Sequence, residues 1–180
     1  MEDTRHTGFT LVELLVALAL SALLAGLAVP AMSRVIDHAR LRAAGETLAQ
    51  QLQFARNHAL SYHTPVFFSV IVDDPEHWCF GWSETAGCNC NTDSAGPSSC
   101  TTSHGNQRLT HRRRSTAFPS VRLAFRNARR LRDIRFSPLR GTASAGTLSL
   151  SNRTGILRVI TSPLGRTRIC AIDQPGYPPC

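Results

Sequence analysis

A long apolar run near the N-terminus constrains this chain more than any other feature. Phe9 to Val29 read FTLVELLVALALSALLAGLAV, 21 residues with one charge. At about 1.5 Å per residue such a helix is roughly 30 Å long, which matches the apolar core of a bilayer. A cleaved secretory signal is the alternative, but its nearest small-residue exit is the poor Val29-Pro30-Ala31. We expect residues 9–30 to form a transmembrane and assembly helix.

The single charge in this run is Glu13, five residues into the apolar segment. Placing a carboxylate inside a bilayer costs about 2.5–3.5 kcal/mol even on a lenient insertion scale. Glu13 therefore needs either a cationic partner or access to the lipid head groups at the helix end.

The residues around Glu13 resemble the processing site of type IV pilins and pseudopilins, because Gly8 to Glu13 read GFTLVE. The resemblance implies that a prepilin peptidase removes residues 1–8 as a leader, cutting between Gly8 and Phe9 and methylating the Phe9 amine. Glu13 would then pair with the N-terminal ammonium of an adjacent subunit during assembly. The leader contains Glu2 and Asp3, whereas leaders in the family are usually basic.

This resemblance also predicts location and partners. It implies a single-pass protein of the inner membrane with a periplasmic head, which reaches a pilus or the cell surface after assembly. The expected partners are other major and minor pilins, the prepilin peptidase and the inner membrane.

Beyond Pro30 the pattern changes to that of an amphipathic helical stem, which we expect over residues 31–62. Its apolar side chains recur at three- and four-residue steps. They are Met32, Val35, Ile36, Ala39, Ala43, Leu48, Leu52, Ala55 and Ala59.

Short runs with β-type composition fill the head, residues 63–180. These runs are Val66–Val72, Trp78–Trp82, Val121–Phe125, Ile134–Ser137, Thr147–Leu150, Gly155–Thr161 and Thr167–Ile172. The predicted fold is α+β, with a long N-terminal helix packed on a small antiparallel β-sandwich.

Ordered motifs in the head resemble the GspH/FimT branch of minor pilins, and most closely FimT. Ala55 to Ala59 read ARNHA, Trp78 to Trp82 read WCFGW, and Gly165 to Cys170 read GRTRIC. They occur in the order that is typical of that branch.

Positive charge is concentrated in the C-terminal half of the chain. The formal net charge is +8, and Asn106 to Cys170 contain 15 arginines against one acid, Asp133. Such a segment favours polyanions, including nucleic acid and anionic lipid.

In FimT proteins the Gly-Arg-x-Arg-x-Cys segment is linked to DNA binding, which implies that Gly165, Arg166 and Arg168 form a DNA site here. Two arginines two positions apart on an extended segment can both grip phosphates. They could equally be solvent-facing side chains of an edge strand. Secondary candidates for backbone contacts are Arg112, Arg113, Arg114, Arg126, Arg129, Arg130 and Arg132.

Two functions from different classes follow. The first is a minor type IV pilin that binds double-stranded DNA without sequence specificity, in a salt-sensitive manner, for natural transformation. The alternative is a structural minor pseudopilin of a type II secretion system, or an initiation pilin that does not bind DNA.

Six cysteines lie in the part of the chain expected outside the membrane, where disulfides persist. We expect Cys170 to pair with Cys180, and the partners of Cys79, Cys88, Cys90 and Cys100 stay open. The Cys-Asn-Cys spacing does not favour zinc, so we expect no metal and no cofactor. No catalytic motif is evident, so an enzyme is not expected.

Overall fold

The computed structural model describes residues 10–92, 96, 98–104, 107–125, 133–172 and 174–180, with the backbone alone described at residues 27–31. The described chain contains one long α-helix, α1 (Leu11–Tyr62), followed by ten β-strands. It divides into two compact units, Met1–Ile36 and Asp37–Cys180.

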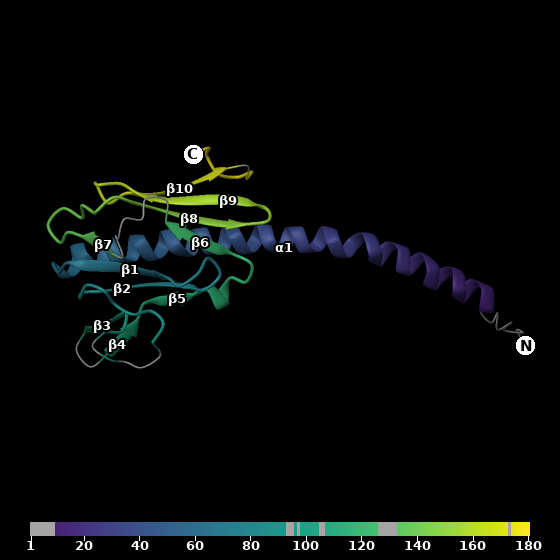
Figure 1. The fold of residues 1–180 in the computed structure, drawn as a ribbon, viewed down its shortest axis with the longest axis horizontal. Coiled ribbons are helices and arrows are strands. Elements are labelled where there is room, and N and C mark those ends of the chain that lie inside the picture. The colour runs from purple at the N-terminus through teal and green to yellow at the C-terminus, as the bar shows by residue number, and fades with distance from the viewer. Residues whose placement is uncertain (1–9, 93–95, 97, 105–106, 126–132, 173) are drawn as a thin grey trace, which may run out of the picture. The chain divides into compact units, whose positions relative to one another are not determined.

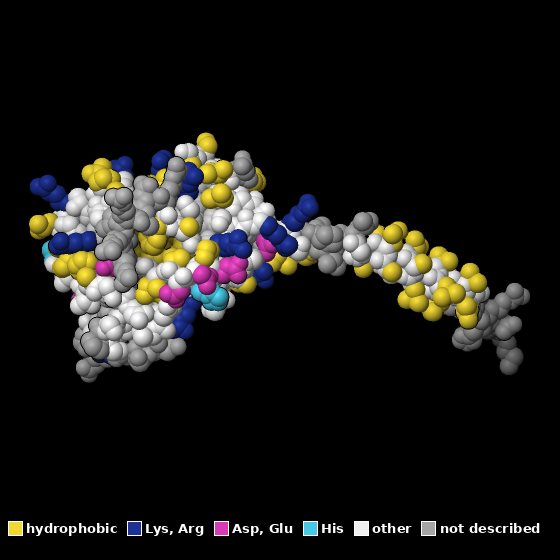
Figure 2. Space-filling model, in the orientation of Figure 1, with side chains coloured by type: hydrophobic (Ala, Val, Ile, Leu, Met, Phe, Trp, Pro, Cys, Tyr) yellow, Lys and Arg dark blue, Asp and Glu magenta, His cyan; other side chains and the backbone are white. Residues whose placement is uncertain are grey.

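Where the structure describes it, the first unit is the N-terminal part of α1. The helix begins directly after Thr10, whose hydroxyl accepts a hydrogen bond from the Glu13 amide at 3.3 Å and so caps the first turn. Figure 2 shows hydrophobic side chains along this part of the helix, and Leu11 and Leu24 are 75% and 67% exposed.

Within the described residues, no helix combines the length and the apolar character that crossing a membrane requires. The expected span, Phe9 to Val29, extends past the described side chains at both of its ends.

The second unit is a head built around the C-terminal half of α1. Leu41, Leu48 and Leu52 are fully buried in one core with residues from both larger sheets. The helix approaches one sheet closely at Gly45, where an added Cβ would lie 3.0 Å from a methyl group of Leu157. The predicted apolar face is buried in this core only from Leu48 onward, at Leu48, Leu52, Ala55 and Ala59. Its earlier members Met32, Val35, Ile36, Ala39 and Ala43 are exposed, and Leu41 and Ala44 are buried instead, so that part of the prediction is wrong.

Two four-stranded antiparallel sheets pack with this helix, and a small two-stranded hairpin lies beyond β2, away from the helix (Figure 1). The first sheet has the order β5-β2-β1-β7, the second has the order β10-β9-β8-β6, and β3 pairs with β4. The strands are β1 (Val66–Val72), β2 (Trp78–Ser83), β3 (Thr101–His104), β4 (Gln107–Thr110), β5 (Arg112–Arg114), β6 (Arg122–Phe125), β7 (Asp133–Phe136), β8 (Gly146–Asn152), β9 (Gly155–Thr161) and β10 (Thr167–Ile172).

The α+β fold predicted from the sequence is confirmed, and each of the seven expected β-type runs overlaps a strand. β3, β4 and β5 were not predicted from the sequence. These strands lack apolar alternation, because they read TTSH, QRLT and RRR, and every residue of β4 is exposed. Backbone pairing alone defines them, and periodicity cannot detect such strands.

Candidate functional site

The N-terminal processing motif is only partly within the described chain. Gly8 and Phe9 lie outside the described residues. Glu13 lies in the first turn of α1, where a carboxylate interacts favourably with the helix dipole. Its side chain is exposed and has no partner among the described residues.

Gly165 lies in the tight turn between β9 and β10. Its amide donates to the Ser162 carbonyl at 2.8 Å, and the Ser162 amide donates to the Arg166 carbonyl at 2.9 Å. The φ angle of Gly165 is +73°, in the left-handed region that favours glycine. Glycine therefore suits the backbone conformation that this tight turn requires.

A second reason for glycine at this position is close packing. A Cβ at Gly165 would overlap the Gly141 carbonyl oxygen and would lie 2.8 Å from Arg56 Nε. The same carbonyl accepts a hydrogen bond from Arg56 Nε at 3.0 Å. Residues from two motifs that are far apart in the sequence, the helix end and the C-terminal turn, thus meet at one structural contact.

Arg166 and Arg168 follow this glycine, and both are exposed. Arg168 lies in β10 opposite Ile160, and β10 is an edge strand of its sheet. Neither guanidinium has a partner among the described residues. Both side chains are therefore available to an anion at this edge of the head.

Arg112, Arg113 and Arg114 do not join that surface, because they form β5 on the edge of the other sheet. Arg112 donates to the carbonyl of Thr92, and Arg114 Nη2 donates to the carbonyl of Asn91 at 2.6 Å. These two side chains brace a loop, whereas Arg113 is exposed. The secondary candidates Arg126, Arg129, Arg130 and Arg132 lie outside the described residues.

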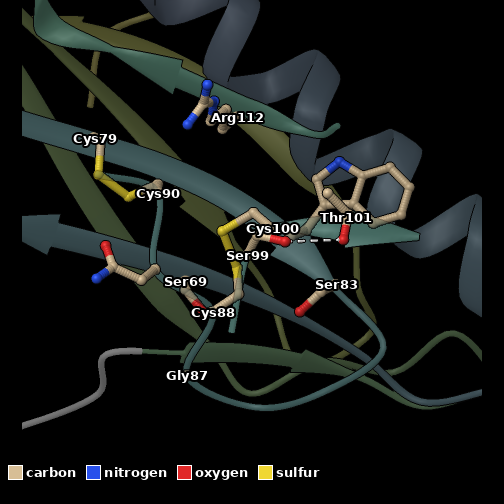
Figure 3. Close-up of a disulfide and its surroundings, with 12 residues drawn as sticks. Ser69, Cys79, Ser83, Gly87, Cys88, Cys90, Ser99, Cys100, Thr101 and Arg112 are labelled. Carbon is tan, nitrogen blue, oxygen red and sulfur yellow. Dashed lines mark hydrogen bonds between the residues drawn. A yellow bond between two sulfur atoms is a disulfide. The ribbon is translucent and has the colours of Figure 1, made fainter. Parts of the chain in front are cut away.

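All six cysteines are paired in disulfides. Cys170 bonds Cys180, which is the pair expected from the sequence. The sequence left the pairing of the other four cysteines open, and in the structure Cys79 bonds Cys90 and Cys88 bonds Cys100. These two disulfides form a small buried cluster of their own (Figure 3).

This cluster explains the glycine of the WCFGW motif. A Cβ at Gly81 would lie 2.7 Å from Cys100 Cβ and would overlap the His111 carbonyl oxygen. Because the four loop sulfurs are bonded to each other, none is a thiolate that could ligate zinc in this state.

Asp37, which sequence reasoning missed, is a buried anchor at the start of the head. Its carboxylate forms an ion pair with Arg153, lies 3.6 Å from Arg40 Nη1 and accepts from the Ser120 hydroxyl at 3.0 Å. The Asp37 backbone carbonyl accepts a hydrogen bond from Asn152 Nδ2 at 2.7 Å. A lone acid in a helical pattern looks solvent-exposed, so only the tertiary fold reveals this role.

Two family models match the chain. One, described as Type II transport protein GspH, matches residues 44–165, and the other, the prokaryotic N-terminal methylation motif, matches residues 3–29. The first covers most of the head: the helix end, strands β1 to β9 and Gly165, but not β10. The chain belongs to the GspH family. It is a type IV pilin-like minor pilin or pseudopilin, and these matches do not single out the FimT branch.

A curated relative supports this GspH assignment. The type II secretion system protein H of Xanthomonas campestris pv. campestris is 41% identical over 69 residues. The match spans 38% of this chain and 39% of the relative's length.

Solved structures resemble the GspH-family fold described above. The minor pseudopilin EpsH from the type 2 secretion system of Vibrio cholerae matches with a TM-score of 0.51 and 15% identity, covering 77% of this chain and 99% of that chain. The type IV minor pilin FimU of Pseudomonas aeruginosa matches with a TM-score of 0.45 and 16% identity, covering 74% and 98%.

Proposed function

We propose that this chain is a structural minor pseudopilin of a type II secretion system, anchored in the inner membrane with its head in the periplasm. The observation that carries the proposal is that one chain combines the GspH head, over residues 44–165, with an N-terminal methylation motif over residues 3–29. The relative of 41% identity is itself a type II secretion protein. This is the second of the two functions that the sequence left open.

In this proposal the chain is a substrate of the prepilin peptidase and a building block, without catalysis of its own. Hydrolysis of the Gly8–Phe9 peptide bond frees the Phe9 amine, which the peptidase then methylates. Glu13 has no partner among the described residues. In the assembly its carboxylate pairs with the N-terminal ammonium of a neighbouring subunit, because a carboxylate in apolar surroundings requires a cation.

The test is gene deletion and complementation in the native host, with the amount of exported enzyme in the medium as the readout. Wild-type protein should restore export, and Glu13→Ala should not, although its N-terminus should still be cut to Phe9. The matched control is Glu46→Ala, which removes an acid from the same helix. Export that is unchanged after deletion, or a chain that is never cut before Phe9, would contradict the proposal.

DNA binding through Arg166 and Arg168 is the second candidate. The observation in its favour is that both arginines are exposed on an edge strand without a described partner. Against it, Gly165 has a packing role of its own and Arg112 and Arg114 are engaged in loop contacts, so the arginines form no continuous described surface.

Fluorescence anisotropy on labelled duplex DNA separates the two functions. The head, residues 37–180, should lose most of its binding in Arg166→Ala/Arg168→Ala if the site is real. The control Arg113→Ala/Arg122→Ala removes the same charge elsewhere and should bind like wild type. Equal loss in both variants indicates general charge attraction, and affinity that does not fall with salt would contradict phosphate binding.

A further inference from the structure

Two neighbouring loops of the head repeat almost the same sequence. Residues 137–141 read SPLRG, and residues 162–166 read SPLGR. The glycines, Gly141 and Gly165, have φ angles of +60° and +73°. In each loop the glycine amide donates to the carbonyl of the leading serine, at 3.0 Å and 2.8 Å. We call the two loops together the twin turns.

The twin turns are fixed side by side. Gly165 packs against the Gly141 carbonyl oxygen, which also accepts from Arg56 Nε of α1 at 3.0 Å. The Ala143 amide donates to the Pro163 carbonyl at 3.0 Å and links the loops again. Both loops lie at the left-hand end of the head in Figure 1. This end of the head is therefore ordered before any partner arrives, which lowers the entropic cost of binding.

Each turn presents one leucine and one arginine to solvent. Leu139 is 85% exposed and Leu164 is 64% exposed. Arg140 and Arg166 are also exposed, have no partner among the described residues, and neither turn contains an acid. A single exposed leucine is common on a monomer. Here two of them lie on turns that contact each other, and apolar side chains grouped on a surface mark a contact in an assembly.

We propose that the twin turns dock a neighbouring pilin-like subunit whose contacting surface is an apolar depression edged with carboxylates. The two leucines would fill the depression, and the two arginines would pair with the carboxylates, which selects the partner by charge. This inference rests on the proposed function, because it assigns the contact that such a subunit makes through its head.

The leucines favour a protein over other anionic partners. A phosphate backbone uses the arginines alone and gives the leucines no apolar surface to cover. A lipid surface needs no fixed geometry, whereas the twin turns are held by three separate backbone and side-chain contacts. Preorganised geometry is an advantage where the partner also has a defined shape.

Photo-crosslinking in cells that assemble the complex tests this inference. Benzoylphenylalanine would replace Leu139 or Leu164 in the full chain, and in a control it would replace Leu109, which is 52% exposed on β4. We expect both twin-turn positions to give an adduct with another protein that carries an N-terminal methylation motif, while position 109 gives none. Adducts only with phospholipid or nucleic acid, or identical adducts at position 109, overturn the inference.

Charge reversal adds a second readout. With the crosslinker at position 164, Arg140→Glu/Arg166→Glu should lower the adduct yield about tenfold, whereas Arg113→Glu/Arg122→Glu should not change it. Circular dichroism of the purified heads checks that both variants fold.

The two proposals fail differently. If the chain is cut before Phe9 and restores export but gives no twin-turn adduct, the docking inference is wrong and the proposed function stands. If it neither is cut nor restores export, both are wrong.

Discussion

Gly165 illustrates at the residue scale how one position meets two separate demands. Its left-handed backbone closes the β9–β10 turn, and its missing side chain leaves room for the Gly141 carbonyl and Arg56. Gly87 meets only the first demand, because its φ is +72° and an added Cβ there would contact nothing within 4 Å. Comparing substitutions at Gly165 and Gly87 therefore distinguishes the cost of backbone strain from the cost of steric overlap.

We predict that Gly165→Ala destabilises the head by about 3 kcal/mol or more, and Gly87→Ala by about 1–2 kcal/mol. The difference between the two losses of unfolding free energy measures the overlap with the Gly141 carbonyl. This carbonyl belongs to the backbone, which cannot move away as a flexible side chain would. Urea unfolding of the purified head gives both values. Equal losses in the two variants would show that the Gly141 contact costs nothing to disturb.

A pair of charges in the β1–β2 turn gives a pH dependence. Asp74 Oδ2 lies 2.6 Å from His77 Nδ1, and this hydrogen bond raises the pKa of His77 and lowers the pKa of Asp74. Histidine with a raised pKa stabilises the fold below its ordinary value of 6.5, and the contribution is lost as the pH rises through the folded-state pKa. The carboxylate contributes above its ordinary value of 3.8 and less as the pH falls through its lowered pKa.

The pair should therefore stabilise the turn fully between about pH 3.8 and 6.5 and less on either side. Asp74→Asn should return the pKa of His77 toward its ordinary value, which an NMR titration of the imidazole protons measures. His38→Gln serves as a control that leaves this turn intact. A His77 titration that is the same in Asp74→Asn and wild type would rule out the coupling.

At the scale of elements, the C-terminal tail extends the sheet beyond β10. The Ala171 amide donates to the Pro178 carbonyl at 3.0 Å, and the Cys180 amide donates to the Ala171 carbonyl at 3.2 Å. The Cys170–Cys180 disulfide closes this short loop and limits the freedom of the unfolded tail.

Replacing both cysteines, Cys170→Ala/Cys180→Ala, should cost about 2–4 kcal/mol, the usual value for such a loop. Hydrogen exchange should show faster exchange at the Ala171 and Cys180 amide positions, while the paired strands β8 and β9 stay protected. Protection that is unchanged at Ala171 would mean that the tail holds its place without the disulfide.

The loop between β2 and β3 depends on arginine side chains as well as on disulfides. Arg112 and Arg114 reach its backbone carbonyls from β5, whereas Arg113 between them is exposed. The alternation of these three residues across one strand gives a matched comparison.

We expect Arg112→Ala/Arg114→Ala to increase the rate of limited proteolysis in this loop several-fold, because local opening becomes easier by about 1 kcal/mol or more. Arg113→Ala should leave the rate unchanged. If wild type, Arg112→Ala/Arg114→Ala and Arg113→Ala are cleaved at similar rates, the disulfides alone hold the loop in place.

On the scale of the whole molecule, the stability of the head resides in residues 37–180. The main hydrophobic core runs from Leu41 to Ala171, and all three disulfides lie within residues 37–180. Asp37 closes the unit by its contacts with Arg153 and Ser120.

We predict that a chain starting at Asp37 melts within a few degrees of the detergent-solubilised full chain, while one starting at Leu48 melts far lower. The second truncation removes Leu41 and Ala44, both fully buried, and the Asp37 anchor. Calorimetry of the three proteins measures this. A large loss on removing residues 1–36 alone would show that the head needs its N-terminal helix to fold.

Several features followed from local pattern alone. The 3.6-residue spacing of Leu48, Leu52 and Ala55 predicts the helix that the structure contains, and alternation predicts strands such as β6, because both signals come from burial of one face. The N-terminal methylation motif was likewise readable without a fold, because it is a run of contiguous residues.

Contacts between distant residues were decided only by the tertiary structure. The sequence did not determine which loop cysteine pairs with Cys79. It did not distinguish Arg112 and Arg114, which contact a loop, from Arg113 between them. Nor did it indicate that Gly141 and Gly165 lie in contact and join the twin turns. The residues in such contacts are separated in the sequence by between 11 and 85 positions. Periodicity reports which face of an element is buried, but only the packed chain determines which side chain lies against which.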